Sequence, residues 1–296
     1  MRHRKKKKGI ASRLVNLAIA AVLVTGIGLM AYPGFSDWWN RMHQSQAIAG
    51  YVEKVADLTP ELYQSMWDEA VRYNEELETD NGRFTPDSTE DERYRRILDV
   101  TGTGIMGYIQ IPSIQVNLPI YHGTDSTVLQ IAIGHIEGSS LPVGGAGTHC
   151  AISGHTGLPS AKLFNDIDKL QKGDHFVLQV LDQSLTYEVD QIDVVLPDEL
   201  DDLAIDPDED YCTLVTCTPY GINTHRLLVR GHRVVSEPSD GAVTADALRV
   251  EPYFVLPFFM IALALLIGIR LAAAVFGNRR QKEEHKTETN TGGEKT

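Results

Sequence analysis

Two long apolar runs, one near each end of the chain, limit the folds and the location available to the residues between them. The first covers residues 14–32, and a helix of this length extends over about 28 Å, close to the hydrocarbon thickness of a bilayer. The second covers residues 253–276 and is interrupted only by Arg270, whose long side chain can reach the interface. We predict two transmembrane helices, the first being either a retained anchor or a signal segment.

The distribution of charge predicts how the chain is oriented in the membrane. Residues 1–13 carry seven Lys or Arg side chains and no acid, and Arg279, Arg280 and Lys282 follow the second apolar run. Basic residues on the outer flank of each run predict cytoplasmic tails at 1–13 and 277–296. The residues between the runs then lie outside the cytoplasm, as part of a protein of the cell membrane. Their strongly acidic composition excludes a nucleic-acid-binding function, which needs a basic surface.

The region 33–103 is predicted to be helical. Thr59 is a typical N-cap with Pro60 at the first helical position, and apolar residues then recur every three or four positions as far as Leu77. The polar stretch 83–92 contains a proline and is predicted to be an exposed loop.

The pattern changes at residue 104 to short apolar runs separated by turn formers. This pattern predicts a mainly β domain over 104–236, an eight-stranded β-barrel with short helices at 126–130 and 160–170, joined by a linker at 237–252 to the second membrane segment. The predicted strands are 105–111, 115–120, 131–134, 148–153, 174–181, 185–195, 211–217 and 225–235.

A cysteine and an arginine are predicted to meet at one end of this sheet. Cys217 ends one strand and Arg226 begins the next, and Pro219, Gly221 and Asn223 between them are turn formers. A neighbouring cation favours the thiolate form of a cysteine, so Cys217 is a candidate nucleophile. The chain has only three cysteines and shows no metal-ligand spacing, so we predict neither a metal nor a cofactor.

A nucleophilic thiol needs a general base, and the chain offers ten histidines. His155 differs from the others because it closes an apolar run and has glycines close by on both sides, at Gly154 and Gly157. Such glycines allow a strand end to turn sharply and present the ring at the rim of a barrel. His155 is therefore the candidate partner of Cys217.

Three segments of the chain resemble class C sortases, the membrane-bound transpeptidases that polymerise pilins in Gram-positive bacteria. They are MGYIQIPSIQVNLPIYHGTDSTVLQIAIGHIEGSSLPVGG, SGHTGLPSAKLFNDIDKLQKGD and TLVTCTPYGINTHRLLVRGHR. The resemblance implies that Cys217 attacks the Thr–Gly bond of an LPXTG-like sorting signal and forms a thioacyl-enzyme. It implies that His155 is the acid and base, and that Arg226 stabilises the oxyanion or holds the substrate. The acceptor would be a lysine amine of another pilin subunit.

Other functions remain open at this stage. A sortase can anchor surface proteins to the amine of a peptidoglycan cross-bridge, and acceptor choice depends on the shape of the groove. A plain cysteine hydrolase would release acid whether or not an amine is supplied. An inactive, membrane-tethered binding module is a further alternative, although the presence of Cys217, His155 and Arg226 together argues against it.

One stretch departs from the class C pattern. The family has a lid before the barrel, in which an Asp-Pro-aromatic motif covers the active site. Here the order differs: Phe84 comes first, and Pro86 and Asp87 follow it. We predict that residues 83–91 form a lid loop, with Phe84 as the candidate plug over Cys217.

Two further features lead to expectations that the structure can address. Residues 198–210 contain eight acidic side chains, which could bind calcium, but their spacing is not that of an EF-hand, so a solvated loop is the favoured interpretation. Cys150 and Cys212 each lie five positions before a candidate catalytic residue, so on neighbouring strands they would lie at equal depth. Two buried thiols are favoured over a disulfide.

Overall fold

The computed structural model describes residues 7–80, 82–85 and 88–235, which belong to two compact units. Of the described residues, those before Ser36 belong to one unit and those from Ser36 to residue 235 belong to the other. The predicted linker at 237–252, second membrane helix at 253–276 and tail at 277–296 lie outside the described residues.

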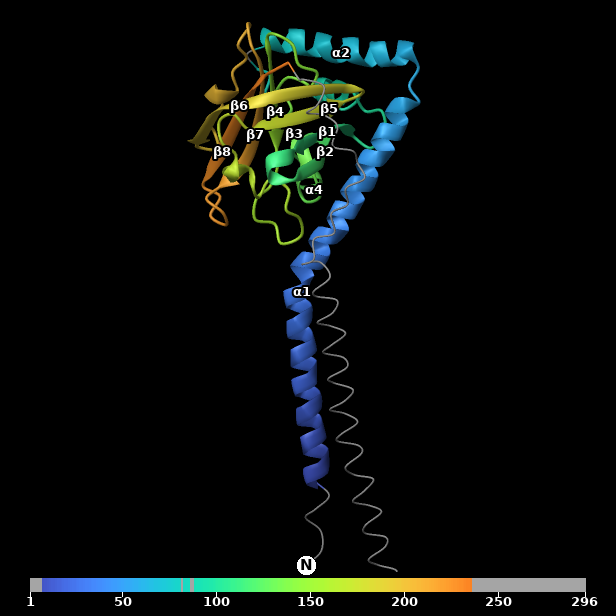
Figure 1. Cartoon of the computed structure of the whole chain (residues 1–296), viewed down its shortest axis with the longest axis vertical. Helices are drawn as coiled ribbons and strands as arrows, with labels where there is room; N and C mark the ends of the chain where they lie inside the picture. Colours follow the sequence, from blue (N-terminus) through green and yellow to red (C-terminus); the bar gives the residue numbers. More distant parts are fainter. Residues whose placement is uncertain (1–6, 81, 86–87, 236–296) are drawn as a thin grey trace, which may run out of the picture. The chain divides into compact units, whose positions relative to one another are not determined.

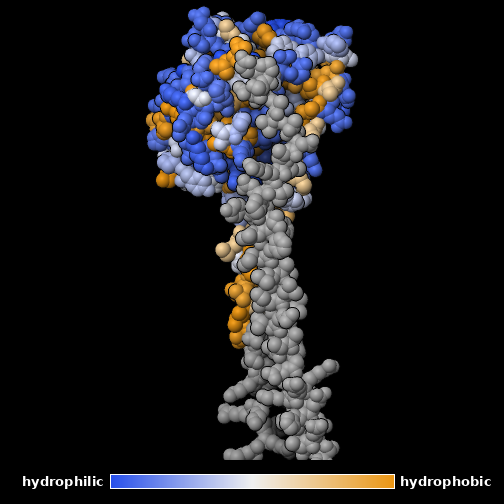
Figure 2. All heavy atoms as spheres, viewed as in Figure 1, coloured by the Kyte–Doolittle hydropathy of each residue, from blue (hydrophilic) through white to orange (hydrophobic). Residues whose placement is uncertain are grey.

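A single long helix, α1, covers Lys7–Ala56 (Figure 1). Among the described residues it holds the one helix that is long and apolar enough to cross a membrane, at Ala18–Ala56. Apolar side chains such as Val22 and Met30 are exposed on it. Figure 2 shows hydrophobic orange on the visible part of this helix and mainly hydrophilic blue on the visible face of the barrel. The helix continues through residue 33, where the sequence predicted a boundary between two regions.

The second part of α1, from residue 36 onward, is hydrogen-bonded to the barrel. The Tyr51 hydroxyl donates to the Met106 carbonyl at 3.0 Å and accepts from the Leu181 amide at 2.7 Å. Tyr51 is fully buried. Because both partners are backbone groups of the barrel, this residue fixes the helix against it.

Two shorter helices precede the barrel. Helix α2 covers Pro60–Glu78 and begins as predicted, with the Thr59 hydroxyl accepting from the Leu62 amide at 3.3 Å. Helix α3 covers Ser88–Tyr94, where the sequence predicted an exposed loop. That prediction was wrong because Tyr94 is a core residue, and its burial anchors a helical turn in an otherwise polar stretch.

Eight strands form a closed barrel, as predicted. Their order around the barrel is β1-β2-β3-β4-β7-β8-β6-β5, and the short helix α4 (Ser126–Leu129) precedes β3. The strands are β1 Ile105–Ile111, β2 Val116–His122, β3 Ile133–His135, β4 Thr148–Ser153, β5 His175–Val180, β6 Gln183–Val195, β7 Asp210–Thr218 and β8 His225–Arg233.

The pairing of three neighbouring strands defines one rim of the barrel. Strand β4 is parallel to β7, with Ser153 opposite Val215, and β8 is antiparallel to β7. The last residues of β4 and β7 and the first residues of β8 therefore lie at the same rim. We call this the β7–β8 rim.

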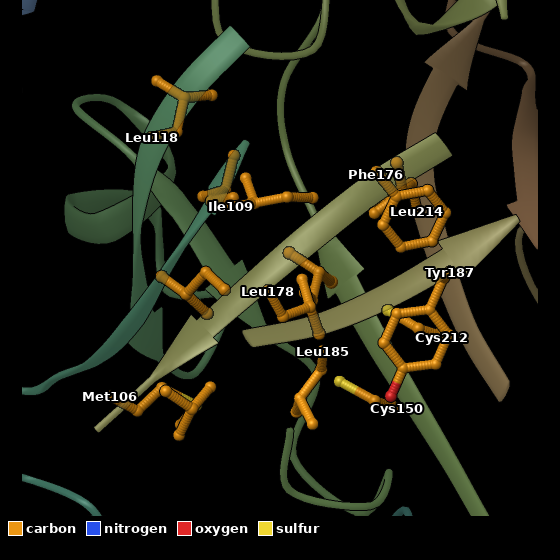
Figure 3. Close-up of a cluster of buried hydrophobic side chains, with 14 of the residues drawn as sticks. Met106, Ile109, Leu118, Cys150, Phe176, Leu178, Leu185, Tyr187, Cys212 and Leu214 are labelled. Carbon is orange, nitrogen blue, oxygen red and sulfur yellow. The ribbon is translucent and has the colours of Figure 1, made fainter. Parts of the chain in front are cut away.

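Apolar side chains fill the interior of the barrel (Figure 3). Phe176 and Tyr187 stack with ring centroids 5.5 Å apart, and both are fully buried. Burial of a large apolar side chain contributes about 1.5–3 kcal/mol, so this core is the main source of barrel stability. Cys150 and Cys212 lie in the same core, opposite each other on β4 and β7.

The helix predicted at 160–170 is mostly absent. Only Ile167–Lys169 forms a 3-10 turn, and Leu163 has a φ of 28°, which an α-helix does not allow. The segment is a loop that inserts Leu163, Phe164 and Ile167 into the core. The spacing of these apolar residues resembles that of a helical face, which explains the error.

Candidate active site

Cys217 and Arg226 are directly opposite each other on β7 and β8. Cross-strand partners project from the same face with Cβ atoms about 5 Å apart. On β7 the core takes Cys212 and Leu214, so alternation turns Cys217 to the outer face, where it is half-buried. The predicted pairing of a thiol with a guanidinium is therefore present in the strand register.

His155 follows β4 at the same rim. The Gly154 amide donates to the Val215 carbonyl at 3.0 Å, so the pairing of β4 with β7 continues past Ser153. Extending that register by two residues brings His155 level with Cys217. The three predicted catalytic residues thus come from three adjacent strand ends.

Arg226 is held in place by backbone oxygens. Its Nη1 lies 3.2 Å from the His225 carbonyl and 3.5 Å from the Asn223 carbonyl. Both acceptors are neutral, and the guanidinium is half-buried, so its positive charge can act on an anion at the rim.

We use the name candidate groove for the outer face of β4 and β7, its floor, together with the connections β3–β4 and β6–β7 beside it, its walls. His149 and Thr213 lie on this floor and are covered by the segment between β6 and β7. His149 Nδ1 is 2.7 Å from the Ala204 carbonyl, and its Nε2 is 2.7 Å from the Thr213 hydroxyl. This pattern fits a neutral ring that donates at Nδ1 and accepts at Nε2. Burial lowers the pKa of His149 to about 4.

Arg83 spans the two sides of this floor. Its Nη1 donates to the Gly138 carbonyl at 3.0 Å, and its Nη2 donates to the Leu203 carbonyl at 2.8 Å. Gly138 lies between β3 and β4, and Leu203 lies between β6 and β7. The stretch before the barrel is therefore tied to both walls of the groove by one side chain.

The lid candidates are placed only in part. The Arg83 guanidinium lies 4.4 Å from the centre of the Phe84 ring, and the Phe84 backbone packs on Gly138. Gly138 lies in the turn that bonds to Ala151 in the middle of β4, and Ala151 pairs with Thr213, four residues before Cys217, or about 13 Å along the strand. Phe84 is thus anchored along the floor, away from Cys217. Pro86 and Asp87 lie outside the described residues.

The other two cysteines lie in the core, away from this site, and the acidic side chains of 198–210 form no metal site among the described residues. Cys150 and Cys212 are buried free thiols within the core. Burial raises the pKa of the Cys212 thiol well above its usual value. In the described part of the chain no group of three or more His, Cys, Asp or Glu side chains is arranged to hold a metal ion, the segment 198–210 included.

Sequence reasoning missed several residues of this region. Arg83 lay inside the predicted lid, but only its neighbours were singled out. His149 stands beside a strand with no distinctive neighbours, and Thr216 was hidden within an apolar run. A hydroxyl or imidazole on a strand reveals its partner only when the register of the neighbouring strand is known.

Comparison with known proteins agrees with this geometry. The model of the sortase domain matches residues 109–234. Sortase D of Bacillus subtilis is 29% identical over 131 residues, which cover 43% of this chain and 63% of that protein. Sortase A of Streptococcus agalactiae is 31% identical over 117 residues, covering 38% of this chain and 47% of that protein. The matches thus span about half to two thirds of these curated relatives.

Solved structures match over their full length. Sortase C1 of Streptococcus agalactiae is 50% identical with a TM-score of 0.63, covering 65% of this chain and 100% of that one. A Clostridium perfringens sortase C, solved with the C-terminal cell wall sorting motif, is 46% identical with a TM-score of 0.56. The match covers 64% of this chain and 99% of that one. The eight-stranded barrel is the fold that these sortase structures share, and the chain belongs to the sortase family. The sortase C structures place it with class C of that family.

Proposed function

We propose that this protein transfers an acyl group from an LPXTG-like sorting signal to a lysine amine of a pilin subunit. The Cys217 thiolate attacks the threonine carbonyl carbon, and the Thr–Gly C–N bond breaks as a thioester forms. His155 gives a proton to the departing amine. It then takes one from the incoming lysine amine, whose nitrogen attacks the thioester and releases Cys217.

The observation that carries this proposal is the register at the β7–β8 rim. Cys217 faces Arg226 across one strand pair, and the extension of β4 brings His155 level with Cys217 across the other. Arg226 lies where a cation can stabilise the oxyanion of the tetrahedral intermediate. Removal of one such donor typically costs a factor of about 10²–10³ in rate. The sorting motif bound in the Clostridium perfringens structure supports the substrate class.

The test uses the full chain in detergent with an LPXTG peptide and a lysine peptide taken from a pilin. We expect an isopeptide product, detected by mass spectrometry, that disappears in Cys217→Ala. Arg226→Ala should lower the rate by about 10²-fold or more. Hydrolysis that is indifferent to the amine would indicate a hydrolase, and binding without turnover would indicate an inactive module.

A second candidate function differs only in the acceptor. Relatives named sortase A are among the similar proteins, and a cell-wall cross-bridge amine is the alternative nucleophile. A competition experiment with equal concentrations of the lysine peptide and a cross-bridge peptide separates the two. We expect the lysine product to dominate, and a dominant cross-bridge product would assign the chain to surface-protein anchoring.

The placement of the protein follows from the same proposal. The apolar part of α1 acts as a membrane anchor, with residues 1–13 in the cytoplasm and the barrel outside it. The exposed apolar side chains of that helix support this placement, since they have no protein cover within the described residues. The predicted lid role is kept for the stretch at Arg83 and Phe84, where Arg83 bonds to both walls of the candidate groove.

A further inference from the structure

The side-chain hydroxyl of the residue before Cys217 is hydrogen-bonded to the backbone carbonyl of the residue before His155. The Thr216 hydroxyl donates to the Gly154 carbonyl at 2.7 Å. Thr216 precedes Cys217 on β7, and Gly154 precedes His155 after β4. This hydrogen bond therefore joins the two chain segments that carry the candidate nucleophile and the candidate base.

The peptide before His155 is held from several sides. The Gly154 amide donates to the Val215 carbonyl at 3.0 Å, and the Phe164 amide donates to the His155 carbonyl at 3.2 Å. A Cβ added to Gly154 would lie within 2.8 Å of side-chain atoms of Phe164 and Ile133, so these side chains press directly on the backbone. The backbone of His155 is thus fixed while its side chain stays half-exposed at the rim.

Thr216 does not reach a substrate. Its side chain alternates with that of Cys217 and turns toward the barrel interior, with 5% of the residue exposed. Any effect of its hydroxyl on the reaction therefore passes through the backbone that it joins, that of Gly154 and His155 on one side and that of Cys217 on the other.

We propose that Thr216 is a positioning residue for the reaction: its hydroxyl ties the Gly154–His155 peptide to the end of β7 that carries Cys217, and thereby sets the imidazole relative to the Cys217 thiol. The inference rests on the proposed transpeptidase function. Without the hydroxyl, the buried Gly154 carbonyl loses its donor and the peptide can rotate. Proton transfer needs hydrogen-bond distances, and a displacement of about 1 Å can reduce a rate by about 10²-fold.

The chain offers a matched control at the other end of β4. Thr148 is also buried, and its hydroxyl also donates to a glycine carbonyl at 2.7 Å, that of Gly145. Thr148 precedes the His155 end of the strand by several residues and contacts none of the three rim residues. Thr148→Val also removes a longer contact with Asp210 Oδ1 at 3.3 Å, so this control loses at least as much hydrogen bonding as Thr216→Val.

The experiment measures kcat, KM and the thermal midpoint for the full-length wild type, Thr216→Val, Thr216→Ser and Thr148→Val. We expect Thr216→Val to lower kcat about 10–100-fold with KM changed less than about twofold. Thr216→Ser keeps the hydroxyl and should recover most of the rate. Thr148→Val should lose thermal stability to a similar extent yet keep its kcat.

Three results would overturn the inference: an unchanged kcat in Thr216→Val, an equal loss of kcat in Thr148→Val, or no recovery in Thr216→Ser. Thr216→Ala also lacks the hydroxyl and must show the same selective loss of kcat, so the test does not depend on one variant folding. A wild-type chain without a Cys217-dependent product would instead contradict the proposed function itself.

Discussion

His149 shows how one buried side chain links the floor of the groove to the stability of the whole barrel. Its two ring nitrogens are both engaged, one by the Ala204 carbonyl and one by the Thr213 hydroxyl. A proton added to Nε2 would meet the Thr213 hydroxyl, which must then turn to accept instead of donate. Burial, together with the nearby charges of Arg230 and Arg83, disfavours the charged ring and lowers its pKa.

The stability of the protein should fall with acidification for this reason. The pKa of His149 drops from its usual value near 6.5 to about 4 on folding, so the unfolded chain binds the proton more readily. The neutral ring makes its full contribution to the free energy of unfolding above about pH 6.5, and this contribution is lost as the pH falls toward 4. We expect the free energy of unfolding to drop by about 2 kcal/mol between pH 7 and pH 5 from this residue.

Urea unfolding at the two pH values measures this effect. His149→Gln retains hydrogen-bonding groups but cannot titrate, so its loss of stability between pH 7 and pH 5 should be smaller than that of the wild type by the same amount. If the two chains lose equal stability over that range, His149 does not carry the effect.

Among single residues, the sequence predicted the site candidates whose residue type and neighbours in the chain are distinctive. Cys217 and Arg226 flank a run of turn formers, and His155 has a glycine just before it and another two positions after it, so all three could be selected as candidates, and the strand register places them at one rim. Arg83 and Thr216 could not, because their importance lies in backbone carbonyls that distant segments supply. A carbonyl is present at every residue, so the sequence carries no signal for which one will accept a hydrogen bond.

Among the elements, the strands were the most predictable. Their apolar runs are separated by turn formers, and all eight predicted strands agree with the observed ones to within about two residues at each end. The prediction of a helix at 160–170 was wrong because a loop that enters the core has apolar residues at spacings that resemble those of a helix. The residues of α3 were predicted to be a loop because their composition is polar, whereas the burial of one residue, Tyr94, anchors the turn.

The segment that begins at Arg83 should control entry to the groove. Arg83→Ala removes both hydrogen bonds to the walls, so the segment should leave the floor more often. We expect KM for an LPXTG peptide to fall several-fold while kcat stays within about twofold, because the catalytic rim is untouched. Peptide titrations under steady-state conditions measure both constants.

Arg93→Ala is the matched control for that variant. It removes the same charge from the same region, but Arg93 pairs with Glu76 on the surface and does not contact the groove walls. Its KM should equal that of the wild type. A KM that rises in Arg83→Ala would show that Arg83 helps to bind the peptide and does not fasten a lid.

For the molecule as a whole, the catalytic unit is larger than the barrel. The sortase-domain match begins at residue 109, yet residues from 36 onward belong to the same compact unit. The Asp37 carboxylate accepts from the Lys162 amide at 3.1 Å, and the Asn40 side chain donates to the Ser160 carbonyl at 2.8 Å. Both contacts hold the loop that follows His155. The helix that precedes the domain therefore supports the catalytic rim directly.

Removal of that helix should impair both folding and activity. A chain of residues 57–235 lacks the hydrogen bonds made by Asp37, Asn40, Gln44 and Tyr51, whereas residues 36–235 keep them. Tyr51 makes two of these five bonds, so at about 1 kcal/mol for each bond we expect a loss of about 5 kcal/mol and a thermal midpoint lower by about 10–20 °C. Its kcat should also fall, measured below the midpoint of both chains, because the His155 loop has lost two of its supports. Equal midpoints in calorimetry and equal kcat values would show that the barrel alone is the catalytic unit.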